Sequence, residues 1–321
     1  MTEKIKLLAV VGPTASGKTS LAVELAKRLD GEVVSCDSMQ IYRGMTVATA
    51  APTAEEQQGV PHHLIGIIDP DESFSVVEYI RLAKEAIAGI AARGRLPILC
   101  GGTGLYYSSL TDGIEFSEAS ELPELREQLR RRAEEEGGQV LLDELAEFDP
   151  QTASRLAPAD HKRIIRAIEV YRATGVTMTQ HIADSRSRPG EYDTTAIGLY
   201  YHDRAVLYER INRRVDIMLE SGLEEEARRF FDRYGQGTAT QAIGYKELRP
   251  WLEGRCSREG ATDNLKRATR RYAKRQISWF GRDERIARLY MDEENTGQSA
   301  ADRALALITA MNKEKDNGTE Q

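Results

Sequence analysis

The sequence predicts an α/β fold, a doubly wound parallel sheet with a helical insertion domain and a helical C-terminal region. Two observations support this prediction. Apolar runs alternate with helical patterns in the first part of the chain, and Glu-, Arg- and Leu-rich helical sequence then continues to an apolar run near residue 194. We expect the first part of the sheet domain at residues 1–114, the insertion at 115–193, the rest of the sheet domain with basic helices at 194–310, and a disordered tail at 311–321.

The elements before the insertion follow from the hydrophobic pattern. The apolar run IKLLAVV at 5–11 predicts a first strand, and a helix is expected at 19–29. The further expected elements are strands at 32–35 (EVVS), 62–68 (HHLIGII) and 96–104 (LPILCGGTG, which ends in a glycine-rich turn), and a long helix at 73–93. Because strands alternate with crossover helices, the strands should run parallel.

Strand and helix patterns return after the insertion. TTAIGLYY at 194–201 predicts a strand, and helices are expected at 204–220, 223–234 and 259–280, the last of which is basic. The polar segment NKEKDNGTEQ at 312–321 is typical of a disordered end.

Composition excludes several classes of protein. Of the 321 residues, 40% are hydrophobic and 30% are charged, which is typical of a globular chain and not of a disordered or membrane-spanning one. Cys36, Cys100 and Cys256 lie far apart, so neither a disulfide framework nor a zinc site is expected, and a reducing cytoplasm fits. The net charge of -7 argues against a nucleic-acid partner for the average surface, but not for a local patch.

Residues 12–19, GPTASGKT, have the spacing of a phosphate-binding loop, a P-loop, between a strand and a helix. The glycines let backbone N–H groups converge on an anion, Lys18 adds a positive charge, and the Thr19 hydroxyl can hold Mg²⁺. The expected phosphate-binding residues are Gly12, Pro13, Thr14, Ala15, Ser16, Gly17, Lys18 and Thr19. The motif predicts a polyphosphate ligand without saying which one.

Polar residues follow the strands expected at 32–35 and 96–104, at the edge where ligands bind in such sheets. Asp37 is compatible with three roles: a metal partner, a general base or the cap of the next turn. The adjoining Ser38, Met39 and Gln40 favour an acceptor site, because Gln can hydrogen-bond a base edge and a carboxylate can receive an amine proton. Thr103 faces the same edge, or belongs to a plain tight turn. His62 and His63 are adjacent on a strand and should point to opposite faces, which argues against a metal site.

A basic segment lies within this acidic chain. Residues 264–288 hold nine basic residues against two acidic ones, and Arg267, Arg270, Arg271 and Lys274 fall on one face of a helix. The aromatic residues Tyr272, Trp279 and Phe280 are interleaved, and the insertion has a second basic run at Lys162, Arg163 and Arg166. This pattern favours RNA binding over the alternative of a solvated face with core aromatics.

Seven segments together resemble the tRNA isopentenyltransferase (tRNA dimethylallyltransferase) family of bacteria, in the same order: GPTASGKTSLAVELA, VVSCDSMQIYRGM, GVPHHLI, GGTGLYYSSL, RINRRVDIMLESGLEEEA, QAIGYKEL and AKRQISWF. The match runs from about residue 4 to residue 280. It implies transfer of a dimethylallyl group from dimethylallyl diphosphate to N6 of the adenosine 3′ of the anticodon, in tRNAs that read codons beginning with U. It also implies Mg²⁺ as cofactor, a cytoplasmic location and a monomer.

The resemblance assigns roles to residues. It implies that the loop at 12–19 holds the diphosphate, that Asp37 is the general base and contacts the adenine with Ser38, Met39 and Gln40, and that Thr103 lies near the reacting centre. It implies that Arg214 binds the leaving diphosphate. The stretches that match tRNA contacts contain Arg126, His161, Lys162, Arg163, Ile164, Ile165, Gln241, Ala242, Ile243, Gly244, Tyr245, Lys246, Lys274 and Arg275.

The chain also departs from the family pattern. Ala48 and Ala51 stand where similar members tend to have Gly and Lys, and Gly281 stands where an arginine is expected, so local contacts with phosphate or RNA are in doubt there. Two other functions are compatible with the loop. One is an adenylate isopentenyltransferase, which would leave the insertion and the basic runs without a role. The other is a nucleotide kinase or an NTP-switched RNA-binding module, which would need a base pocket not visible in the sequence.

Overall fold

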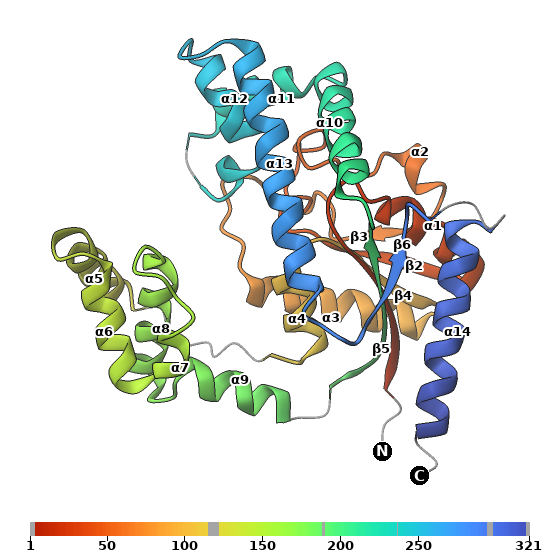
Figure 1. The fold of residues 1–321 in the computed structure, drawn as a ribbon, viewed down its shortest axis with the longest axis horizontal. Coiled ribbons are helices and arrows are strands. Elements are labelled where there is room, and N and C mark those ends of the chain that lie inside the picture. The colour runs from red at the N-terminus through yellow and green to blue at the C-terminus, as the bar shows by residue number, and fades with distance from the viewer. Residues whose placement is uncertain (1–3, 115–121, 188–189, 236, 294–297, 319–321) are drawn as a thin grey trace. The chain divides into compact units, whose positions relative to one another are not determined.

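The computed structural model describes residues 4–114, 122–187, 190–235, 237–293 and 298–318 (Figure 1). The chain forms two compact units: Met1–Tyr107 with Tyr192–Gln321, and Ser108–Glu191. No helix among the described residues is long and apolar enough to cross a membrane.

The first unit is built on a six-stranded sheet in which every pair of neighbouring strands is parallel. Its strands are β1 (Ile5–Val11), β2 (Gly31–Cys36), β3 (His62–His63), β4 (Leu96–Gly101), β5 (Tyr192–Tyr200) and β6 (Ile286–Tyr290), in the order β3-β2-β4-β1-β5-β6. Every residue of β2 is buried, as is usual for a parallel sheet covered on both faces. The α/β class and the parallel sheet predicted from the sequence are confirmed.

Strand register brings three loops to one edge. Val11, the last residue of β1, pairs with Gly101, the last residue of β4, and Gly101 also pairs with Cys36, the last residue of β2. The chain therefore leaves all three strands at the same level. The phosphate loop, the segment after Cys36 and the turn after Gly101 meet there for this reason.

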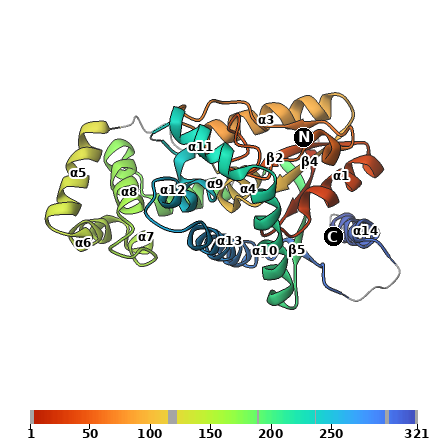
Figure 2. The same ribbon diagram turned by 90° about the horizontal axis from the view of Figure 1, so that it is seen from above.

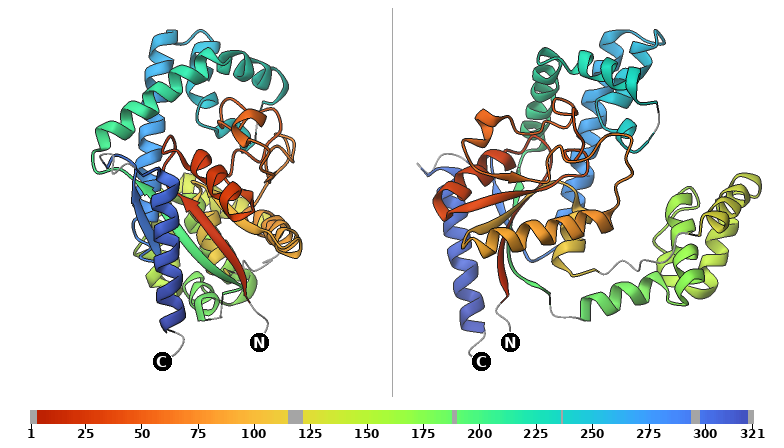
Figure 3. Two further views of the ribbon diagram at one scale, coloured as in Figure 1. Left: turned by 90° about the vertical axis from the view of Figure 1, so that its right-hand side faces the viewer. Right: turned by 180° about the vertical axis from the view of Figure 1, so that it is seen from behind.

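Helices cover both faces of the sheet. α1 (Lys18–Leu29) and α14 (Ala300–Gly318) pack on one face, where Leu21, Leu25 and Ala304 join a buried core with the strands. α3 (Val76–Ala92) packs against β2 and β4. Figures 2 and 3 show α3 and α14 on opposite sides of the sheet, which is the doubly wound arrangement.

A helical group extends the first unit beyond the carboxyl edge of the sheet. Its elements are α10 (Arg204–Glu220), α11 (Leu223–Arg233), the short helix η1 (Ala239–Gln241), α12 (Tyr245–Leu252) and α13 (Arg258–Phe280). α10 and α13 lie side by side above that edge (Figure 1) and bury Leu207, Ile211 and Ala273 together with Ala15 of the phosphate loop. The remaining helices of this unit are α2 (Ala54–Gln57) and α4 (Gly104–Thr111), which begins in this unit and ends in the second.

The second unit consists of helices with a core of their own. α5 (Pro123–Glu135), α6 (Gly138–Phe148), α7 (Pro150–Ala153), α8 (His161–Thr174) and α9 (Met178–Ser187) follow one another. Leu129, Leu141, Leu145, Ile164 and Ile168 are buried between them. The sequence placed this insertion at 115–193, and the compact unit runs from Ser108 to Glu191.

Several elements differ from the sequence prediction. The strand expected at 62–68 has only two residues, because the backbone leaves the sheet at Leu64 with a φ of 63°. Helix α12 and strand β6 were not predicted. The tail expected to be disordered from 311 is helical as far as Gly318: the Lys315 ammonium donates to the Asp193 carboxylate (2.6 Å) and to the Thr194 carbonyl (2.9 Å), which ties the end of α14 to β5. The rest of that tail, 319–321, lies outside the described residues.

Candidate active site

The phosphate loop is held in shape from outside. Gly12 and Gly17 have φ angles of 143° and 96°, which side-chain-bearing residues rarely adopt, and a Cβ on Gly12 would lie 2.9 Å from the Leu199 carbonyl oxygen. The Arg210 Nε donates to the Ala15 carbonyl at 3.0 Å, and the Tyr201 hydroxyl donates to the Ser16 carbonyl at 3.2 Å. These two hydrogen bonds hold the loop carbonyls in place. The protein therefore fixes the conformation of the loop without a ligand.

The N-terminus of α1 is prepared for an anion. Gly17 gives the helix no side-chain cap, and the first turn contains no acidic residue. The helix dipole and the uncapped N–H groups therefore favour negative charge at this end. Ser16 lies in the same loop, and its buried hydroxyl has no hydrogen-bond partner within the described part of the chain.

A cleft of about 810 Å³ lies in front of the loop, and all of its lining residues belong to the first unit. It brings together many of the residues that the sequence singled out: Thr14, Ala15, Ser16, Gly17, Lys18, Thr19, Asp37, Ser38, Met39, Gln40, Arg214, Gln241, Ala242, Ile243, Lys246 and Arg275. Segments of the first unit from Thr14 to Gln276 thus form one site.

Positive side chains gather in this cleft. Lys18 lines it together with Arg210, Arg213 and Arg214. The pKa of Lys18 is lowered to about 8, mainly by burial; Arg214 acts in the same direction, whereas Cys100 and Asp37 act in the opposite one. Burial also lowers the pKa of Arg214, whose guanidinium makes a long hydrogen bond of 3.4 Å to the Ala50 carbonyl. The Lys18 ammonium also donates to the Pro13 carbonyl at 2.6 Å. Buried cations that lie this close together favour an anionic ligand.

Asp37 combines the cap of a turn with a free acceptor. Its Oδ1 accepts from the N–H of Met39 (2.8 Å) and the N–H of Gln40 (3.3 Å), so the capping role left open by the sequence is observed. Within the described part of the chain, both hydrogen bonds to this carboxylate reach Oδ1 and none reaches Oδ2. The second carboxylate oxygen is left for a ligand, a metal or a proton.

Thr103 lies beside Asp37 in the structure. Its N–H donates to the Cys36 carbonyl at 3.1 Å, and its Oγ1 accepts from the Ser38 N–H at 3.1 Å. Thr103 therefore joins the turn after β4 to the segment after β2. Thr103 is part of a tight turn and is not among the lining residues of the cleft, but it holds the segment that carries Asp37.

The Gln40 side chain is already engaged by the protein. Its Oε1 accepts from the Ser35 hydroxyl at 2.9 Å, and its Nε2 donates to the carbonyls of Thr49 and Ala50 at 3.4 and 3.3 Å. Gln40 thus holds the segment that forms the far wall of the cleft. A contact of this amide with a base edge would require these bonds to be exchanged.

Glu226 fixes the same wall from the other side. Its buried carboxylate accepts from the N–H groups of Val47 (2.8 Å) and Ala48 (2.9 Å) and from the Tyr245 hydroxyl (3.0 Å). Ala48, one of the departures from the family pattern, packs against Gly244, where a Cβ would lie 3.5 Å from its own. Gly244 and the fully buried Tyr245 therefore support the cleft wall and do not line it.

The residues expected to contact RNA in the second unit differ in their exposure and in their partners. Lys162 and Arg163 are exposed on α8, and His161 is half-buried. Ile164 and Ile165 are buried in the core of that unit, so their side chains are not available to a ligand. Arg126 donates to both oxygens of the buried Glu169 carboxylate, at 2.9 and 3.0 Å.

The basic face of α13 is largely solvent-exposed. Arg267, Arg271 and Lys274 are exposed, whereas Arg270 donates to the Asn212 side chain at 2.5 Å. The interleaved aromatics have three different environments. Phe280 is buried against Tyr107, Trp279 is 43% exposed, and Tyr272 lines the cleft with the Arg275 guanidinium 5.5 Å from its ring centroid.

Sequence reasoning missed several residues of the site. Four side chains that hold loops in place were not predicted: Tyr201, Arg210, Glu226 and Gln276. The sequence shows them only as polar residues and does not indicate which loop each of them contacts. His62, which was considered only as a metal ligand, lines the cleft. Its Nδ1 lies 2.9 Å from the Val60 carbonyl, so its buried Nε2 is an acceptor without a partner in the described structure, and burial lowers its pKa. No group of three or more potential metal-ligating side chains occurs within the described ranges.

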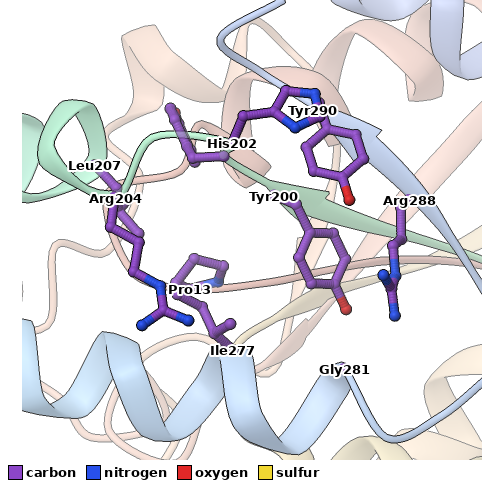
Figure 4. A pocket seen from close by; sticks show the side chains of 10 residues that line it. Pro13, Tyr200, His202, Arg204, Leu207, Ile277, Gly281, Arg288 and Tyr290 are labelled. Carbon is purple, nitrogen blue, oxygen red and sulfur yellow. The ribbon is translucent and has the colours of Figure 1, made fainter.

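A second, smaller hollow of about 330 Å³ lies at the ends of β5 and β6 (Figure 4). The His202 ring stacks on Tyr290 with 3.7 Å between centroids, and the Arg288 guanidinium lies 5.6 Å from the Tyr200 centroid. Of the residues predicted for the site, Pro13 is the one that lines this hollow. Gly281, another departure from the family pattern, also borders it.

Comparison with known proteins gives concordant results. Residues 40–283 match the family model described as IPP transferase. A tRNA dimethylallyltransferase of Caldanaerobacter subterraneus subsp. tengcongensis is 47% identical over 298 residues, which cover 91% of this chain and 94% of that protein. The enzyme of the same name from Bacillus subtilis is 46% identical over 278 residues, with coverage of 86% and 88%.

Solved structures agree with the sequence comparison. The full-length tRNA isopentenylpyrophosphate transferase from Bacillus halodurans superposes with a TM-score of 0.71 at 42% identity, over 98% of this chain and all of that one. A eukaryotic dimethylallyltransferase acting on tRNA superposes with a TM-score of 0.79 at 27% identity, over 94% of this chain and 77% of that one.

Proposed function

Because this chain belongs to the IPP transferase family and is an enzyme of the tRNA dimethylallyltransferase class, we propose that it prenylates N6 of the adenosine 3′ of the anticodon. The donor is dimethylallyl diphosphate, and the acceptors are tRNAs that read codons beginning with U. One observation carries the proposal. A single cleft joins an uncapped helix N-terminus and several cationic side chains to the Asp37 carboxylate, whose second oxygen accepts no hydrogen bond from the described residues.

The donor half of the reaction belongs to the phosphate loop. An adenine N6 amine is a poor nucleophile because its lone pair is delocalised into the ring, so the leaving group must depart readily. As the allylic C–O bond breaks, its electron pair goes to the diphosphate. The α1 N-terminus, Lys18 and Arg214 stabilise that negative charge as it develops, which lowers the transition state.

The acceptor half belongs to Asp37. As the N6–C bond forms, the nitrogen becomes positive and its proton becomes acidic. The unused oxygen of Asp37 takes this proton, and such catalysis contributes roughly 10²- to 10⁴-fold. Thr103 and Ser38 hold the Asp37 segment in place, and His62 offers a buried acceptor in the same cleft.

The site fits Mg²⁺. This ion takes few protein oxygens and completes its shell with water and phosphate oxygens, so the absence of a larger acidic cluster within the described ranges is compatible with it. The Thr19 hydroxyl, which lines the cleft, would hold the ion, and the Asp37 carboxylate in the same lining would add to it. When bound, the ion supplies charge neutralisation for the diphosphate.

Parallel incubations test the proposal. The purified protein receives dimethylallyl diphosphate labelled in its carbons, together with tRNA in one tube and AMP in another, each with and without ATP. We expect label on the tRNA adenine, inhibition by inorganic diphosphate, and neither a need for ATP nor its hydrolysis. Label on AMP would establish an adenylate isopentenyltransferase instead. Turnover that depends on ATP would establish the kinase or switch function.

A further inference from the structure

We propose that Gln276 is a positioning residue that locks the phosphate loop to the turn that carries Thr103. Gln276 lies on α13 and is 4% exposed. Its Oε1 accepts from the Thr14 N–H at 2.8 Å, and its Nε2 donates to the Gly102 carbonyl at 2.9 Å. One side chain therefore bridges the loop after β1 and the turn after β4. This inference rests on the proposed function, which gives those two loops the donor and acceptor halves of the reaction.

The chemistry of the bridge fits glutamine. One partner is an N–H and the other is a carbonyl, so the bridging side chain must accept at one atom and donate at the neighbouring one. A carboxylate cannot donate and an ammonium cannot accept. The space is also reserved, because a Cβ on Gly102 would lie 2.0 Å from the Gln276 Nε2. Any residue larger than glycine at 102 would displace the amide.

The bridge continues to the proposed base through short contacts. Gly102 is followed by Thr103, whose Oγ1 accepts from the Ser38 N–H, and Ser38 follows Asp37. On the other side, Thr14 precedes Ser16 and Lys18 in the phosphate loop. The Gln276 amide thus lies between the groups that hold the diphosphate and the group that takes the proton.

Positioning at this point matters for the rate. Transfer requires the allylic carbon and the adenine nitrogen to meet in one geometry, and a misplacement of about 1 Å costs roughly 10²-fold. Without the bridge the buried Gly102 carbonyl and the half-buried Thr14 N–H would lose this partner, and the two loops would be free to move apart. The folded protein would retain both loops but lose their mutual register.

Gln276→Met tests the bridge, because methionine has a similar length and volume and can make neither hydrogen bond well. We expect kcat for prenyl transfer to fall by about 10- to 100-fold. The KM for tRNA should stay within about twofold of the wild type, and the affinity for inorganic diphosphate should weaken several-fold. Phe280→Leu is the matched control: this buried residue of the same helix packs on Tyr107, so its replacement should lower stability with kcat within about twofold.

Gln276→Glu adds a second measurement, the pH dependence of kcat, which would not change if Gln276 had only a structural role. Protonated glutamic acid has the shape and the hydrogen-bonding groups of glutamine, whereas the carboxylate lacks the donor. The ratio of variant to wild-type kcat should therefore rise as the pH is lowered from about 8 to about 6. A flat ratio, or a Gln276→Met enzyme within twofold of the wild type, overturns the proposal, as does an equal decrease of kcat in Phe280→Leu. If the wild type itself fails to label tRNA, the proposed function fails, and the diphosphate affinity still reports on Gln276.

Discussion

Asp37 shows how one side chain serves both a turn and a reaction. Its Oδ1 holds the turn that contains Met39 and Gln40, which fixes the direction of the carboxylate before any ligand arrives. The other oxygen accepts no hydrogen bond from the described residues, and we assign the acceptor proton to it. The motif around Asp37 predicted its place at the sheet edge, but the division of labour between its two oxygens depends on the folded turn.

Asp37→Asn should lower prenyl transfer by at least about 10²-fold and leave tRNA affinity nearly unchanged. The amide oxygen of asparagine can still cap the turn, but the amide is no base. Single-turnover rates and a tRNA binding titration measure the two effects. Asp71→Asn is the control, because this exposed carboxylate is not part of the cleft lining. A parallel decrease of binding and turnover in Asp37→Asn would contradict the assigned role.

Lys18 should give the enzyme a pH dependence. Its folded-state pKa is about 8, below the usual 10.5, so the ammonium is present below pH 8 and is deprotonated as the pH rises through that value. The KM for dimethylallyl diphosphate should therefore rise above about pH 8, while Lys18→Arg, which stays charged, should lack this inflection. Lys18→Ala should lower transfer by at least about 10²-fold at every pH.

The lowered pKa of Lys18 also makes the free energy of unfolding depend on pH. Because the pKa is lowered on folding, the unfolded chain binds more protons between pH 8 and 10.5, and Lys18 opposes folding most at lower pH. Its destabilising contribution should fade as the pH rises through this window. Wild-type stability that falls faster than that of Lys18→Ala over this window would contradict the shift.

Helix α13 illustrates how much one element contributes. Its inner side carries Gln276 to the phosphate loop, its cleft side carries Tyr272 and Arg275, and its outer side carries the exposed basic face. The helical spacing of the basic residues in the sequence predicted this basic face. It could not reveal that Arg270 bonds to Asn212, because that contact depends on the packing of α10 against α13.

The exposed basic face should carry a measurable share of RNA affinity. Changing Arg267, Arg271 and Lys274 to alanine together should weaken tRNA binding and reduce the slope of log affinity against log salt by about 0.7 to 0.9 for each phosphate that is no longer neutralised. Binding titrations at several salt concentrations measure the slope. Alanines at Arg81 and Lys84 of α3 form the control, with no expected change. An unchanged slope in the triple variant would make this face a solvated one.

At the scale of the whole molecule, the two units have separate cores. The phosphate loop, Asp37, Thr103 and α13 all belong to the first unit, and the helices around Leu141 and Ile168 to the second. The cytoplasmic location and the monomeric state expected from the resemblance stay predictions. Because the two units have separate cores, a small ligand of the first unit should stabilise the first unit alone.

Saturating inorganic diphosphate should slow amide hydrogen exchange in residues 12–19 and in the turn at 101–104, because a ligand stabilises the states in which its site is intact. Exchange in the core helices α6 and α8 of the second unit should not change. Mass spectrometry of peptides from both units measures the effect, and Lys18→Ala should show it only weakly. Equal slowing in both units would contradict the independence of their cores.

The sequence by itself determined the fold class, the phosphate loop, the position of Asp37 and Thr103 at one sheet edge, and the basic character of α13. These features rest on local patterns: apolar periodicity, glycine spacing and charge along a helix. Tertiary structure alone decided that Ile164, Ile165 and Tyr245 are buried, that the Gln40 and Arg126 side chains bond within the protein, and that residues 311–318 continue a helix tied to β5. It also decided that Gln276 reaches Thr14 of the phosphate loop, 262 positions away along the chain. Such contacts depend on which elements pack together, and local sequence does not encode the partner of a side chain that is distant along the chain.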